Sequence, residues 1–185
     1  MSLFRIALAN LPFPSTPEES IALAEQAIAQ AATEQAGLIC FPECFIPGYR
    51  GMGRRVPPPD PVFLERAWSV IAAAAARANL VVILGTERVV QGALVIAALV
   101  INRDGTIAGF QDKVQLDPSE ETTYSASSGR RVFQTGPLTF GIAFATKGGA
   151  IRKRSAGPPG AAHTSSSTLI STGHSHLVIN APHIV

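Results

Sequence analysis

The sequence predicts an α/β fold in which helices cover a mixed β-sheet. Apolar runs of strand length alternate with helical repeats up to residue 84, whereas the segments that follow are strand-like pairs joined by tight turns. In addition, 46% of the 185 residues are hydrophobic and only 15% are charged, so the chain can bury one core of ordinary size. This composition excludes global disorder, a collagen-like repeat and a coiled coil.

The first three predicted elements are a strand, a helix and a second strand. The apolar segment 4–11 is typical of a strand and is ended by prolines. Ser15 or Thr16 can cap the following helix, Pro17 suits its first turn, and apolar residues recur at helical spacing to about residue 35. The continuous apolar run 37–41 is typical of a strand buried on both faces.

Turn signals separate the later elements. Five prolines and three glycines predict an irregular loop at 47–61, and Asp104-Gly105 is a strong hairpin signal. The expected elements are a helix at 62–78, a strand at 80–84, a hairpin of 93–102 with 106–111, and a short pair of strands at 132–134 and 138–143.

Charge divides the chain into two unequal parts. All 13 acidic residues lie in 1–143, whereas 144–185 carries all four histidines and no acid. The second part is rich in Ser, Thr, Gly and Pro and has no amphipathic period, so we expect coil with at most a short strand at 177–179. The sequence therefore predicts one domain at 1–143 and a poorly structured tail at 144–185.

Several classes of function are not predicted. The apolar stretches are too short or too polar to span a membrane, and no secretory signal is present, so we expect a cytoplasmic protein. Cys40 and Cys44 lack the spacing of a zinc site or disulfide framework and are expected to be small buried residues. The histidines have no acidic partner in the tail and the basic run 152–154 has no interleaved aromatic residues, so no metal, cofactor or nucleic-acid partner is predicted.

Two charged residues stand where open α/β sheets place their chemistry. Glu43 follows the buried strand 37–41 and precedes the proline-rich loop, while Lys113 follows the strand at 106–111. From position alone, Glu43 could equally be a loop glutamate in water, and a lysine placed like Lys113 is more often a solvated surface side chain.

Taken together, several segments resemble the nitrilase superfamily of carbon–nitrogen hydrolases. They occur in the order and spacing of that superfamily, and the resemblance covers essentially all of residues 3–143. The segments are 37–43 (GLICFPE) with Gly48-Tyr49, 112–116 (DKVQL), 118–120 (PSE) with Tyr124, and 132–143.

The resemblance implies a fold, a reaction and a set of roles. It implies a four-layer α-β-β-α sandwich with mixed sheets, incomplete in this chain, a homo-oligomer, and small nitrile, amide or carbamoyl substrates. In that chemistry a cysteine thiolate attacks the substrate carbon and water later releases the acid from a thioester. Glu43 would be the general base, Lys113 the charge that stabilises the oxyanion, and Glu120 the group that orients the lysine, with Glu121 as a less well-spaced alternative.

The nucleophile is the point at which the sequence departs from the superfamily. A cysteine is expected after Phe144, but Ala145 occupies its place, so the chain as written is predicted to be inactive. Read one nucleotide earlier with suitable synonymous codons, residues 144–160 can translate as ICHEGWRYPETVRWAAR, which resembles the superfamily's nucleophile segment. We therefore hypothesise a one-nucleotide frame slip near codon 144, and the nucleotide sequence of the gene tests it.

Two alternative functions stay open. The first is a non-catalytic, degenerate subunit that pairs with an intact homologue, which co-purification of the two chains would reveal. The second is a hydrolase with a different nucleophile, Ser165 or Ser166. It is disfavoured because neither serine lies in a Gly-x-Ser-x-Gly elbow.

Overall fold

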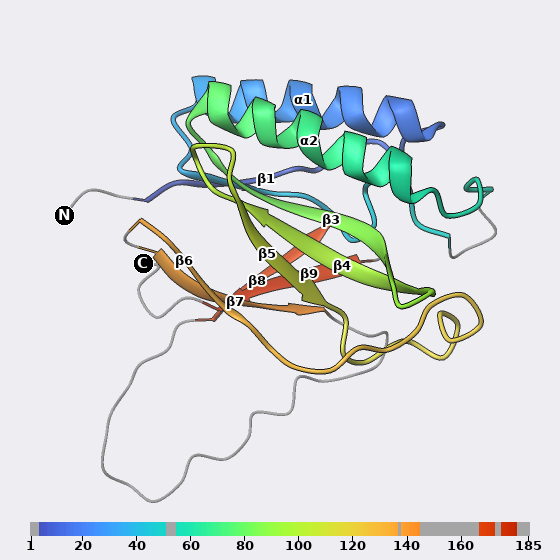
Figure 1. The fold of residues 1–185 in the computed structure, drawn as a ribbon. Helices are drawn as coiled ribbons and strands as arrows, with labels where there is room; N and C mark the ends of the chain where they lie inside the picture. Colours follow the sequence, from blue (N-terminus) through green and yellow to red (C-terminus); the bar gives the residue numbers. More distant parts are fainter. Residues whose placement is uncertain (1–3, 51–54, 137, 145–166, 173–174, 181–185) are drawn as a thin grey trace, which may run out of the picture.

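The computed structural model describes residues 4–50, 55–136, 138–144, 167–172 and 175–180 (Figure 1). The elements, in chain order, are β1 (Ile6–Leu8), α1 (Pro17–Thr33), β2 (Leu38–Cys40), α2 (Pro61–Ala78), β3 (Val81–Val90), β4 (Ala93–Ile101), β5 (Ile107–Asp112), β6 (Val132–Thr135), β7 (Leu138–Phe144), β8 (Ser167–Thr172) and β9 (Ser175–Asn180).

The first sheet is mixed, as predicted. Its strand order is β1-β2-β3-β4-β5, in which β1, β2 and β3 are parallel and β4 and β5 are added antiparallel. The two crossovers between the parallel strands contain α1 and α2, and both helices cover the same face of this sheet (Figure 1). Because β1 and β2 are parallel, their carboxyl ends lie at the same edge of the sheet. Glu43 follows β2 at this edge.

Both predicted helices are present, and each begins at a proline that follows an N-cap residue. The Thr16 hydroxyl accepts a hydrogen bond from the backbone N–H of Glu19 at 3.1 Å, immediately before α1. The Asp60 carboxylate accepts the backbone N–H groups of Val62 and Phe63 at 3.0 and 3.1 Å, immediately before α2. These bonds satisfy donors that the first helical turn leaves unpaired. Of the helices in the described residues, none has the length and apolar character needed to cross a membrane.

The strand expected at 80–84 is longer than predicted. In the structure, β3 continues to Val90 and turns directly into β4 through Gln91 and Gly92, which have φ values of 51° and 81°. Two consecutive residues with positive φ are typical of the tight turn that suits the twist of a hairpin. The prediction was wrong because Thr86, Glu87 and Arg88 interrupt the apolar run, although all three belong to the strand ladder.

The second sheet is antiparallel and has the order β6-β7-β9-β8. The predicted pair at 132–134 and 138–143 corresponds to β6 and β7. The predicted short strand at 177–179 lies inside β9, which pairs with β7, whereas β8 was not expected. The division of the chain at residue 143 and the out-of-frame origin of 144–185 stay predictions.

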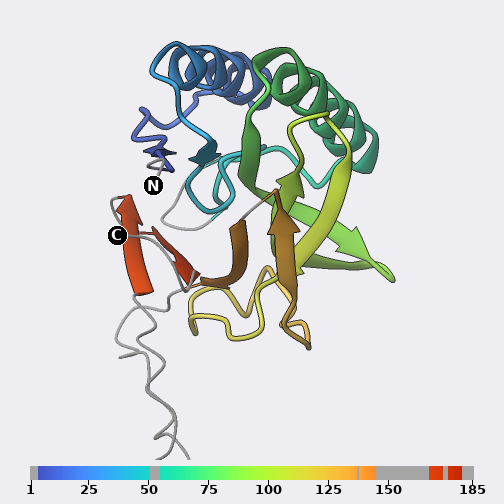
Figure 2. The same ribbon diagram turned by 90° about the vertical axis from the view of Figure 1, so that its left-hand side faces the viewer.

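The described residues form three layers: the helices, the first sheet and the second sheet (Figure 2). One core lies between the helices and the first sheet, with Ile28, Leu64 and Ile71 almost fully buried there. The second core lies between the sheets, where Phe133 and Phe140 stack at 5.7 Å and pack with residues of β2 and β3. This arrangement is the α-β-β part of the expected sandwich; the outer fourth layer is not among the described residues.

Candidate active site

Glu43 is buried in a segment that crosses closely over β3. The backbone N–H of Ile46 donates to the carbonyl of Gly85 at 3.2 Å, and Ile46 forms an isolated bridge with Thr86. A Cβ atom at Gly85 would lie 1.8 Å from the carbonyl oxygen of Pro42 and 2.9 Å from Cα of Glu43. Only glycine permits this approach, and it leaves the Glu43 residue 4% exposed.

Lys113 lies at the end of β5 and joins two carboxylates. Its backbone N–H donates to the carbonyl of Ile96 at 2.8 Å, which continues the ladder with β4 one residue beyond the strand. The side chain points inward, and the residue is 1% exposed. Its Nζ donates to Oε1 of Glu43 at 2.8 Å and to Oε1 of Glu120 at 2.9 Å. The structure thus brings together three residues that are up to 77 positions apart.

A short turn holds Glu120 in place. Its backbone N–H donates to the carbonyl of Asp117, and its Oε2 accepts the backbone N–H of Asp117 at 2.9 Å. The backbone N–H groups of Thr123 and Tyr124 both donate back to the carbonyl of Glu120. Glu121, the alternative candidate, is exposed and therefore outside the buried cluster.

Burial and the neighbouring charges shift the pKa values of Glu43 and Lys113. Burial raises the pKa of Glu43 from its ordinary 4.5 to about 7, because the attraction of Lys113 offsets only part of the lost hydration. For Lys113, burial alone lowers the pKa, but the charges and hydrogen bonds of Glu43 and Glu120 together raise it above its ordinary value. The ammonium therefore stays charged near neutral pH, while Glu43 can take up and release a proton there.

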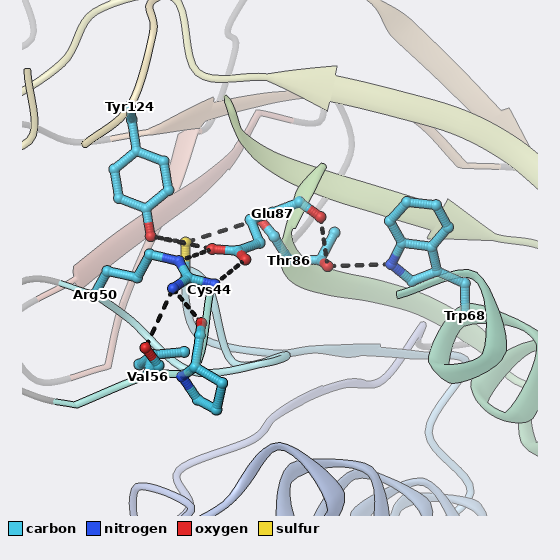
Figure 3. Close-up of polar contacts among 8 residues, drawn as sticks. Cys44, Arg50, Val56, Trp68, Thr86, Glu87 and Tyr124 are labelled. Carbon is cyan, nitrogen blue, oxygen red and sulfur yellow. Dashed lines mark hydrogen bonds and ion pairs between the residues drawn. The ribbon is translucent and has the colours of Figure 1, made fainter. Parts of the chain in front are cut away.

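A second ion pair joins Arg50 and Glu87 (Figure 3), and it lies near this cluster because the charges of Glu43 and Glu87 both act on the Cys44 thiol. The Arg50 guanidinium donates through Nε and Nη2 to the two carboxylate oxygens of Glu87, at 2.8 and 2.6 Å, and Glu87 is fully buried in β3. Nη1 of Arg50 donates to the carbonyl oxygens of Val56 and Pro57. Arg50 thereby connects the described part of the proline-rich loop to β3 of the first sheet.

Both cysteines are buried and are poor nucleophiles. Burial strongly raises the pKa of the Cys40 thiol. At Cys44, burial and then the neighbouring charges of Glu43 and Glu87 raise the thiol pKa, and the sulfur lies 3.9 Å from the Tyr124 hydroxyl. The reactive species in thiol chemistry is the thiolate, so both cysteines are held in the inert form. They are small buried residues, as predicted.

The end of β7 lies against the same region. Phe144, its last residue, packs on the cluster of Cys44, Ile96 and Tyr124. Ala145, which the sequence places at the nucleophile position, lies outside the described residues, as do Ser165, Ser166 and three of the four histidines, His163, His174 and His183. Within the described part of the chain, no group of three or more His, Cys, Asp or Glu side chains is arranged to hold a metal ion.

A cavity of about 200 Å³ lies between the start of α1 and the proline-rich loop. Its walls include Phe13, Pro47, Tyr49 and Val56. The Tyr49 hydroxyl donates to Oε1 of Glu120 at 2.9 Å, so this side chain connects the cavity wall to the buried charges.

Sequence reasoning missed the partners that surround the three predicted residues. Tyr49 and Tyr124 were noticed only as part of the resemblance, and Arg50 and Glu87 were not noticed. One signal was available: a Thr-Glu-Arg run inside a strongly apolar segment predicts a buried polar network if that segment is one continuous strand.

A sequence profile of the carbon–nitrogen hydrolase family matches residues 5–150. This match covers more than half of the chain, and the chain belongs to that family, within the nitrilase superfamily. Two similar curated proteins are arylacetonitrilases. That of Arthroderma benhamiae is 32% identical over 127 residues, covering 62% of this chain and 37% of the relative; that of Aspergillus niger is 30% identical over 115 residues, covering 55% and 34%. The chain thus spans little more than a third of these relatives.

Solved structures share the fold. An amidase from Nesterenkonia sp. superposes with a TM-score of 0.63 at 23% identity, covering 75% of this chain and 54% of the amidase. A glutamine-dependent NAD+ synthetase from Acinetobacter baumannii superposes with a TM-score of 0.65 at 22% identity, covering 75% of this chain and 27% of the synthetase. At this level of identity the likeness concerns the fold alone.

Proposed function

We propose that this chain carries the acid–base half of an active site that hydrolyses non-peptide C–N bonds of nitriles, amides or carbamoyl amines. One observation supports this most: the buried Lys113 ammonium bridges two buried carboxylates, one of which has its pKa raised to about 7. A general base works best when its pKa is near the working pH, and a fixed buried cation is suited to stabilise a developing oxyanion. Glu43 is the proposed base, Lys113 the proposed oxyanion stabiliser, and Glu120 the residue that orients the lysine.

The proposed reaction of an amide balances as follows. Glu43 takes the proton of a cysteine thiol, and the sulfur attacks the carbonyl carbon while Lys113 donates to the oxygen. The C–N bond breaks, ammonia leaves with the proton from Glu43, and a thioester remains. Glu43 then takes a proton from water, the hydroxide adds to the thioester carbon, and the acid leaves as the thiol is reprotonated. The net change is amide plus water to acid plus ammonia.

We propose that the nucleophile is missing from the chain as written. Phe144, the residue before the expected nucleophile position, packs beside Cys44 and Tyr124, which supports a link between the end of β7 and the site. With alanine there, base and oxyanion stabiliser have no sulfur on which to act, so the chain is proposed to be inactive in covalent turnover. The proposed cause is the one-nucleotide frame slip near codon 144.

The test restores the alternative frame and measures ammonia release. Arylacetonitriles, simple amides and carbamoyl amines form the substrate panel, since similar proteins include arylacetonitrilases and an amidase. The restored protein is expected to release ammonia, to lose this activity on alkylation, and to lose it in Glu43→Gln; the chain as written is expected to release none. Ammonia release by the purified chain as written would overturn the proposed loss of the nucleophile. An inactive chain that co-purifies with an intact homologue would instead support a role as a degenerate subunit.

A further inference from the structure

The two carboxylates that bind Lys113 accept different numbers of hydrogen bonds. Among the described residues, the hydrogen-bond donor to the Glu43 side chain is Lys113. The Glu120 carboxylate accepts three bonds: from Lys113 and the Tyr49 hydroxyl on Oε1, each at 2.9 Å, and from the backbone N–H of Asp117 on Oε2, also at 2.9 Å. Both glutamates are 4% exposed, so the difference arises from these donors and not from access to water.

We propose that Tyr49 is a positioning residue that acts through Glu120: its hydroxyl fixes the Glu120 carboxylate against Lys113 and so leaves Glu43 as the carboxylate of this pair that can take up a proton. Two carboxylates close to one ammonium compete for a proton, and the one with more donors keeps its charge. The proposal rests on the proposed function, in which Glu43 is the general base. It adds a residue to that site and explains how two similar glutamates come to have different roles.

The other groups around the cluster are consistent with this division. Burial, and then the hydrogen bond and charge of Glu120, raise the pKa of Tyr49, so its hydroxyl remains a proton donor near neutral pH. The Cys44 thiol next to Glu43 is likewise neutral. The Glu87 carboxylate is bound on both oxygens by Arg50. Glu43 is therefore the group beside Lys113 that can take up and release a proton near neutral pH.

The neighbouring residue holds Tyr49 in place. Arg50 follows Tyr49 directly, and its side chain binds Glu87 in β3 while the Tyr49 side chain reaches Glu120. In Figure 3 the guanidinium lies between Glu87 and the loop carbonyls, Val56 among them. A two-pronged bond to a buried carboxylate fixes the guanidinium plane, and with it the adjacent backbone. The Arg50–Glu87 pair is therefore the clamp that sets the position of the Tyr49 hydroxyl.

The test follows the two carboxyl carbons by NMR while the pH of the full chain is raised from 5 to 9. Glutamate is labelled with ¹³C, and the two signals are assigned with Glu43→Gln and Glu120→Gln. Tyr49→Phe removes one hydroxyl and keeps the ring. Tyr124→Phe is the matched control, because it removes another tyrosine hydroxyl of the same region that faces Cys44 and Glu87. Arg50→Lys keeps the charge but cannot make the two-pronged bond.

In the parent chain, the titration near pH 7 is expected at Glu43. In Tyr49→Phe, the proton occupancy of Glu120 relative to Glu43 should rise roughly ten- to a hundredfold, the effect of one lost hydrogen bond to a charged group. Arg50→Lys should shift the occupancy in the same direction by less, and Tyr124→Phe should leave it unchanged. The proposal would be overturned if Tyr49→Phe left the relative proton occupancy of the two glutamates unchanged, or if Glu120 titrated near pH 7 in the parent. If Arg50→Lys left this occupancy unchanged, the proposed role of the Arg50–Glu87 pair would be overturned.

This test does not depend on turnover. A frame-restored protein that releases no ammonia would overturn the proposed function while leaving the measured proton division intact. Conversely, an active restored protein whose carboxylates titrate alike with and without the Tyr49 hydroxyl would overturn only the role of Tyr49.

Discussion

The free energy of unfolding of the parent chain should fall as the pH rises, and the substitution Glu43→Gln should abolish the part of this fall that comes from Glu43. The pKa of Glu43 is 4.5 when the chain is unfolded and about 7 when it is folded. Between these values the folded state binds more protons than the unfolded state, so the free energy of unfolding falls with rising pH. At about 1.4 kcal/mol for each tenfold change in proton affinity, the fall attributable to Glu43 is about 3 kcal/mol between pH 4.5 and pH 8.

Urea unfolding at pH 4.5, 6 and 8 measures this effect as a difference between two proteins. The free energy of unfolding of Glu43→Gln, relative to that of the parent, should increase by about 3 kcal/mol from pH 4.5 to pH 8. Glu121→Gln is the matched control because it neutralises an exposed carboxylate next to the cluster, and it should behave as a surface substitution. If the parent and Glu43→Gln lose stability in parallel over this range, the reasoning about the buried charge is refuted.

Three further predictions concern the surroundings of the site. Gly85→Ala should lower the free energy of unfolding by several kcal/mol in urea, since its Cβ would overlap the Pro42 carbonyl. Arg50→Ala should lower the free energy of unfolding by about 3–5 kcal/mol, because it leaves the buried Glu87 carboxylate without its main partner. Arg77→Ala breaks an exposed ion pair and should lower it by less than about 1 kcal/mol. Similar losses in the two variants would contradict the role of burial. Iodoacetamide at pH 8 should leave both cysteines of the folded chain unmodified by mass spectrometry until urea is added; rapid labelling would show that they are not held as buried thiols.

Local patterns predicted much of the fold because helices and strands follow from nearest-neighbour chemistry. The cap at Thr16 predicts the start of the first helix, and the bounds predicted for both helices are close to the observed ones, whereas the cap at Asp60 was found only in the structure. The same reasoning failed for β3, because the polar side chains of Glu87 and Arg88 are stabilised by partners that are distant in sequence. A window of adjacent residues contains no information about such partners.

The sequence by itself determined the alternation of strands and helices, the family, and the positions of Glu43, Lys113 and Glu120 at the ends of elements or in a turn. Only the tertiary structure decided that these three side chains meet, that they do so almost without water, and that the Tyr49 hydroxyl donates to Glu120. The physical reason is that hydration and charge pairing depend on distances between segments far apart in the chain. Those distances exist only once the strands have paired and the loops have closed over them.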